Sequence, residues 1–184
     1  MLGEHLFWIT SRAAGTVALL LSSVAVCAGL LMGGRLVSAR RFDLRPTHEA
    51  LSLAALAALV VHAVSLLGDS YLRPGLAEIT VPFASGYREP WMSIGIVAGW
   101  AMLALGLSYY ARRRIGVARW RRLHRLTALA WLGGLVHSLG EGTDAGAAWF
   151  LVATGLVALP ALALLVVRHV RAPGGAPGTQ PATP

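Results

Sequence analysis

The stretch THEALSLAALAALVVHAV, residues 47–64, places two histidines fourteen residues apart in an otherwise apolar segment. A helix of this length and composition is suited to crossing a lipid bilayer. Polar side chains inside a bilayer are costly and usually mark a functional site. A second stretch, LHRLTALAWLGGLVHSLG at residues 123–140, carries two histidines thirteen residues apart. The two segments together predict a membrane protein with its functional groups inside the bilayer.

The whole chain has the composition of a membrane protein. Of its 184 residues, 56% are hydrophobic and 13% are charged, and the mean hydropathy is +0.64. Soluble domains contain about 25% charged residues. The sequence predicts an all-α integral membrane protein, with a membrane domain over residues 1–171 and a disordered Pro/Gly-rich tail over residues 172–184. Because a span needs roughly 20 residues, we expect a bundle of five transmembrane helices, at residues 7–33, 47–68, 91–111, 123–140 and 147–167.

The positive charge is unevenly distributed along the chain. The net charge is +8, and every basic residue apart from histidine is an arginine. The arginines gather in the connections 34–46 and 112–122 and near the C-terminus. By the positive-inside rule, the N-terminus lies outside and the C-terminus lies in the cytoplasm. We expect a multi-pass protein of the bacterial plasma (inner) membrane, in contact with lipid, and the charge requires no nucleic-acid partner.

The histidine spacing places four side chains at two depths. A helix advances about 100° and about 1.5 Å per residue. His48 and His62 therefore point the same way to within about 40° and lie about 21 Å apart, near opposite sides of the bilayer. His124 and His137 lie about 20 Å apart, but their directions differ by about 140° on an ideal helix. The second helix has to tilt, distort near residues 133–134, or present its ligands to either side.

The histidines pair by depth, because both segments run outward from the cytoplasm. His48 and His124 share the inner depth, and His62 and His137 share the outer depth. Two facing imidazoles suit a six-coordinate haem iron that transfers electrons. Zinc or copper fits less well, because each depth offers two ligands and no cysteine or carboxylate apart from Glu49. The alternative is a haem-free scaffold or transporter subunit, whose histidines bind protons or a metal, or bond neighbouring helices.

Three further stretches resemble a known family. WITSRAAGTVALLL (residues 8–21), PFASGYREPW (82–91) and WRRLHRLTALAWLGGLVHSLGEGTD (120–144) resemble, together with the histidine spacings, the ferric reductase-like transmembrane domain family. That family includes NADPH oxidases, ferric reductases and the haem subunit of bacterial methionine sulfoxide reductase. The resemblance covers about residues 8–167. It implies two b-type haems stacked across the membrane, one held by each histidine pair, with electrons passed between them.

The function implied by the resemblance is transmembrane electron transfer, from a cytoplasmic or quinol donor to an extracytoplasmic acceptor. Larger members of the family carry flavin- and NADPH-binding domains, but no G-x-G-x-x-G pattern follows the membrane segments here. We therefore expect an electron-transfer subunit of an oxidoreductase. Its donor is a separate flavin reductase or membrane quinol, and its acceptor is a redox protein or a small molecule. The alternative is a terminal reductase that passes electrons to ferric iron or oxygen at the outer haem.

Arginines near the expected membrane edges are secondary candidates. Haem propionates need hydrogen-bond donors there. The residues expected to serve them are Arg12, Arg73 and Arg88 at the outer haem and Arg45, Arg122 and Arg125 at the inner haem. Contact with lipid headgroups and the setting of topology are the simpler explanations of these charges.

Trp131 and several glycines complete the candidates. Trp131 lies at a depth between the two histidine pairs, where it packs either between haems or, more simply, between helices. Five glycines are expected to leave room beside a haem or between helices: Gly15, Gly95, Gly99, Gly133 and Gly134. The connection 69–90 is too apolar for a solvated loop, and we expect it to fold back over the outer surface.

Overall fold

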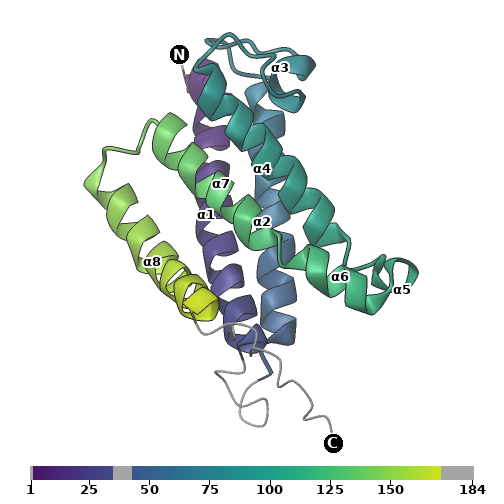
Figure 1. Ribbon diagram of the computed structural model, residues 1–184. Coiled ribbons are helices and arrows are strands. Elements are labelled where there is room, and N and C mark those ends of the chain that lie inside the picture. The colour runs from purple at the N-terminus through teal and green to yellow at the C-terminus, as the bar shows by residue number, and fades with distance from the viewer. Residues whose placement is uncertain (1, 35–42, 171–184) are drawn as a thin grey trace, which may run out of the picture.

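The protein is a bundle of helices in a computed structural model that describes residues 2–34 and 43–170 (Figure 1). The helices are, in chain order, α1 (Leu2–Gly33), α2 (Arg45–Leu66), α3 (Leu76–Thr80), α4 (Glu89–Leu107), α5 (Arg112–Ile115), α6 (Val117–His124), α7 (Thr127–Glu141) and α8 (Ala148–Val170). These two ranges contain no β-strand, so the predicted all-α class is confirmed. Arg35, Arg40 and Arg41 of the basic connection 34–46, and the tail 172–184, lie outside the described residues.

Four helices in the described ranges are long and apolar enough to cross a membrane: His5–Gly33 within α1, then α2, α4 and α8. The chain is therefore an all-α, multi-pass membrane protein. α7 has 15 residues, which corresponds to about 22 Å, against a hydrocarbon core of about 30 Å. A fifth span requires α6 and α7 together, so the count of five and the orientation of the bundle stay predictions.

The fourth expected segment is not one continuous helix. α6 ends at His124 and α7 begins at Thr127. Three backbone N–H groups near this break bond to carbonyls three residues earlier: Leu126 to Leu123, Ala128 to Arg125, and Leu129 to Leu126. This is the tighter 3₁₀ pattern, which turns about 120° per residue, so three such residues bring the directions of His124 and His137 about 60° closer. Of the three alternatives for this segment, a helix break near residues 133–134 is not observed, since α7 is continuous there.

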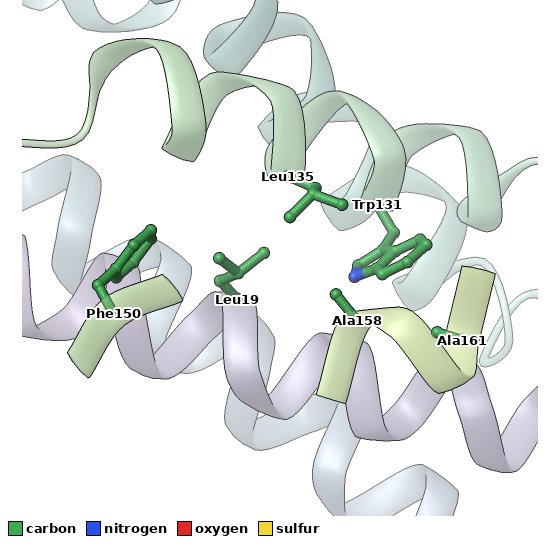
Figure 2. Close-up of a cluster of buried hydrophobic side chains, with 6 residues drawn as sticks. All are labelled: Leu19, Trp131, Leu135, Phe150, Ala158 and Ala161. Carbon is green, nitrogen blue, oxygen red and sulfur yellow. The ribbon is translucent and has the colours of Figure 1, made fainter. Parts of the chain in front are cut away.

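Two antiparallel helix pairs, α1 with α2 and α4 with α7, carry the candidate site. α8 packs on the other side of α1 (Figure 1). A buried cluster joins α1, α7 and α8 (Figure 2): Leu19, Trp131, Leu135, Phe150, Ala158 and Ala161. Helices in a bilayer associate by close packing and hydrogen bonds. The two small alanine side chains of α8 allow this helix to pack closely against its neighbours. The indole N–H of Trp131 donates to the Ser23 hydroxyl at 2.9 Å and connects α7 to α1.

The connection between α2 and α4 folds back against α4, and its placement over the outer membrane surface stays a prediction. The indole N–H of Trp100 donates to the carbonyl of Thr80 at 2.8 Å. Closer to the start of α4, the Phe83 N–H donates to the Ser93 hydroxyl at 2.8 Å. These bonds hold the connection, including α3, against one side of α4. They leave the face of α4 that packs on α7 free for the site.

Candidate functional site

The four histidines form two facing pairs, with α2 on one side and α6 and α7 on the other. The ring centres of His48 and His124 lie 6.2 Å apart, with the ring planes at 90°. Those of His62 and His137 lie 6.4 Å apart, with the planes at 66°. The structure thus brings the four candidates together in the two combinations that their depths suggest. Binding of haem by these pairs stays a prediction.

The spacing within each pair suits one metal ion between two imidazoles. A metal–nitrogen bond is about 2 Å long, and a ring nitrogen lies about 1.1 Å from its ring centre, so two opposed ligands put their ring centres about 6.2 Å apart. The observed separations are 6.2 and 6.4 Å. In the ranges 2–34 and 43–170, no group of three or more His, Cys, Asp and Glu side chains is placed to hold a metal. A porphyrin supplies the other four ligands itself, so the residues present fit haem.

Backbone carbonyls select the tautomer of three of the four imidazoles. Each donates from Nδ1 to a carbonyl of the neighbouring helix: His48 to Ala25 at 2.8 Å, His62 to Ser11 at 2.8 Å, and His137 to Trp91 at 2.9 Å. A carbonyl oxygen only accepts, so Nδ1 carries the proton and Nε2 keeps its lone pair. Such a bond orients a metal-binding histidine and raises its basicity. In these three rings, Nε2 is therefore the nitrogen that is free to bind a metal ion.

A glycine follows each of these carbonyls by four residues, and the imidazole packs on it. A Cβ atom would lie within van der Waals distance of the ring at every one: 3.2 Å from His48 at Gly29, 2.9 Å from His62 at Gly15, and 2.5 Å from His137 at Gly95. The sequence predicts room at Gly15 and Gly95, whereas Gly29 was missed. Gly29 could have been found from its spacing, because Gly15 and Gly29 are fourteen residues apart, like the two histidines of α2.

His124 has a weaker contact of the same kind. Its buried Nδ1 misses strict hydrogen-bond geometry, but the Leu105 carbonyl of α4 lies close enough to interact with the ring. The imidazole also stacks on Trp120, with ring centres 5.0 Å apart and planes at 25°. The inner pair is therefore held by a carbonyl on one side and by an indole on the other.

A cavity of about 820 Å³ opens beside the inner pair and is lined by both of its histidines. Its size lies within the range of about 300–1,000 Å³ that is usual for ligand pockets. Of the inner arginines expected to serve propionates, Arg45 and Arg125 line the cavity, whereas Arg122 is exposed elsewhere on α6. Three lining arginines were missed, because α5, α6 and α8 each bring one to the cavity: Arg112, Arg121 and Arg168.

Each of the three outer arginines has a partner within the protein. Arg12 forms a two-bond ion pair with Asp144, Arg88 lies 3.4 Å from Glu141 without hydrogen-bond geometry, and Arg73 donates to the Ser70 carbonyl at 2.9 Å. The first two pairs tie α1 and the start of α4 to the end of α7. This gives the two arginines a structural role, and their contact with propionates stays a prediction.

Trp131 lies at the expected depth but within the helix core. Its side chain is 1% exposed and packs among residues of α1 and α8 (Figure 2). Both its burial and its hydrogen bond to Ser23 fit the simpler of the two interpretations, packing between helices. A role between haems stays a prediction.

Comparison with known proteins finds one related family. The family described as "Ferric reductase like transmembrane component" matches residues 14–135, about two thirds of the chain. The matched region contains His48, His62 and His124, and it ends just before His137. No curated protein and no solved structure gives a significant match.

Proposed function

The chain belongs to the ferric reductase like transmembrane component family, and on that premise we propose that it carries electrons across a membrane through two bis-histidine b-type haems. His48 and His124 hold the inner haem, and His62 and His137 hold the outer haem. Family membership supports transmembrane electron transfer. The observation that carries the two-haem assignment is the pair of ring separations, 6.2 and 6.4 Å, at which one iron fits between each two imidazoles.

The chemistry that a bound haem supplies is a one-electron couple between ferric and ferrous iron. The protein positions and insulates that couple. Two imidazole ligands would leave a bound haem iron no open position, which would favour electron transfer over binding of external ligands. The carbonyl bonds at Nδ1 of His48, His62 and His137 leave the lone pair of Nε2 available, and these atoms would hold the iron. The arginines that line the inner cavity neutralise carboxylates placed there.

The two ends of the bundle serve different partners. The inner, arginine-rich end faces the cytoplasm of a bacterium and accepts electrons from a separate flavin reductase or from membrane quinol. The outer end delivers them to an extracytoplasmic redox protein or to a small acceptor. Five spans, with the N-terminus outside, give this arrangement, and the basic connections support it through the positive-inside rule.

The test is a count of haems in the purified, detergent-solubilised protein. Haem is measured per chain, and reduced-minus-oxidised spectra are recorded. We expect two low-spin b haems, with loss of one in His48→Ala and loss of the other in His62→Ala or His137→Ala. His5→Ala, which changes an exposed histidine of α1, should keep both.

Three other outcomes would contradict parts of the proposal. One haem in the unaltered protein would show that one pair is misassigned. Folded protein without haem would favour a scaffold or transporter subunit. Rapid reduction of external ferric chelates by the reduced protein alone would favour a terminal reductase over a carrier that needs an acceptor protein.

A further inference from the structure

Glu141 is a carboxyl group without a role in the proposed function, and it lies one helical turn beyond a candidate haem ligand. It is the last residue of α7, four positions after His137. Four residues advance a helix by about 6 Å and turn it about 40° past one full turn, so the two side chains leave the same face of α7. Glu141 therefore lies at the outer end of the face that carries His137.

Two successive contacts between the start of α4 and the end of α7 hold this part of the molecule. The Trp91 carbonyl accepts from Nδ1 of His137 at 2.9 Å. One turn further along α7, Nε of Arg88 lies 3.4 Å from Oε2 of Glu141. The indole of Trp91 packs on Gly140, the residue before Glu141. The segment that orients His137 therefore also holds the carboxyl group beside the outer pair.

The carboxyl group of Glu141 is covered by protein, but its cation does not bond it. The side chain is 13% exposed, and Oε2 is buried with no hydrogen-bond partner among the described residues. The Arg88 side chain is 47% exposed and meets this oxygen outside hydrogen-bond geometry. Burial raises the pKa of Glu141, and the charge of Arg88 opposes that rise. Glu141 therefore takes up a proton more readily than a solvated carboxylate does, next to a side chain that reaches water.

Two other carboxyl groups near this end of the bundle have partners of their own. Asp144, in the turn after α7, forms the two-bond ion pair with Arg12 of α1. Asp69, in the turn after α2, accepts through Oδ1 from two backbone N–H groups of that turn. Arg88, by contrast, acts on Glu141 through its charge alone. The carboxyl group of Glu141 is therefore the one of the three that can respond to a change of charge at the outer pair.

We propose that the carboxyl group of Glu141 takes up one proton from the outer aqueous side when the outer haem is reduced, and releases it when that haem is oxidised. The inference rests on the proposed function, in which the inner haem supplies the electron. A haem with two neutral imidazole ligands carries one positive charge at its centre in the ferric state and none in the ferrous state. Loss of that charge removes an attraction for the carboxylate and favours its protonated form. The proton then balances the charge of the electron.

The test is a redox titration at a series of pH values, on purified protein in which two haems per chain have been counted. At low pH Glu141 stays protonated in both states, so neither midpoint potential should depend on pH. As the pH rises further, one of the two midpoints should fall, by up to about 59 mV for each tenfold change in proton concentration. Reduced-minus-oxidised infrared spectra should show a protonated carboxyl band that is gained on reduction.

Three substitutions locate the proton. Glu141→Gln keeps the size of the side chain without its titration, so it should abolish both the fall in midpoint and the infrared band. Glu89→Gln removes an exposed carboxylate of the same segment and should keep both. Arg88→Gln removes the opposing charge and should move the fall to higher pH, which decides the question if Glu141→Gln does not retain its haems.

Two-haem protein whose midpoints are independent of pH would overturn the inference and leave the proposed function standing. A fall in midpoint that persists in Glu141→Gln would also overturn it, because the proton then belongs to another group, such as a haem propionate or Asp69. An unmoved fall in Arg88→Gln would contradict the electrostatic argument. A missing haem in the unaltered protein would instead contradict the proposed function.

Discussion

Gly15→Ala should weaken the outer haem site and leave the inner site intact. The new methyl group would lie 2.9 Å from Nδ1 of His62, about 0.6 Å inside an ordinary contact of about 3.5 Å. If the ring retreats by that amount, its hydrogen bond to Ser11 lengthens from 2.8 Å to about 3.4 Å, beyond the usual limit of about 3.2 Å. Loss of this orienting bond should lower haem affinity by about 10–100-fold.

Gly29→Ala is the matched comparison at the inner site. Its Cβ would lie 3.2 Å from Cε1 of His48, only about 0.3 Å inside an ordinary contact. The hydrogen bond to Ala25 would then lengthen from 2.8 Å to about 3.1 Å and persist. Both substitutions raise the helix propensity of α1, by up to about 1 kcal/mol each. A selective loss of haem in Gly15→Ala therefore cannot come from a weaker helix.

The assay is the transfer of haem from detergent-solubilised protein to an excess of a haem-free globin, followed by absorption. Gly15→Ala should release one haem much faster than the unaltered protein does and retain the second. Gly29→Ala should release both at nearly the original rates. Equal retention in Gly15→Ala and the unaltered protein, or faster loss from Gly29→Ala than from Gly15→Ala, would refute the reasoning from these contacts.

Three further predictions concern the packing around the site. Asp144→Asn leaves the partly exposed Arg12 guanidinium without its counter-charge and should lower the free energy of unfolding by about 1–3 kcal/mol. Asp43→Asn changes an exposed pair and should alter the free energy of unfolding by less than about 1 kcal/mol. Thermal unfolding in detergent measures both changes. Trp131→Phe removes the buried N–H donor and leaves a gap, so the free energy of unfolding should fall by about 1–3 kcal/mol. Both haems should be retained, and loss of a haem would contradict the packing role. Burial raises the pKa of Glu141 above its ordinary 4.5, with partial opposition from its arginine partner. The folded protein then keeps a proton that the unfolded chain releases, so stability should fall as the pH rises from 4.5 through the raised pKa. Glu141→Gln should remove that fall in unfolding curves recorded across this pH range.

The sequence by itself determined the all-α membrane class and the depths of the four histidines. Both follow from properties of a single helix, because rise per residue is constant and bilayer thickness sets the length of a span. Depth alone was enough to combine His48 with His124 and His62 with His137, and no knowledge of packing was needed. The thirteen-residue spacing carried a conflict in direction that periodicity could not resolve. The 3₁₀ hydrogen bonds within residues 123–129 reduce this difference in direction.

Only the tertiary structure decided which groups of different helices meet. The carbonyl of Ser11 and the glycine at position 15 support His62 because α1 and α2 pack antiparallel in one register, which their separate apolar patterns leave open. Arg12 likewise forms an ion pair with Asp144, which lies 132 residues later in the chain. Periodicity describes one helix at a time, whereas a hydrogen bond or an ion pair between helices depends on their relative rotation and translation. The support of each candidate ligand is therefore a property of the folded bundle.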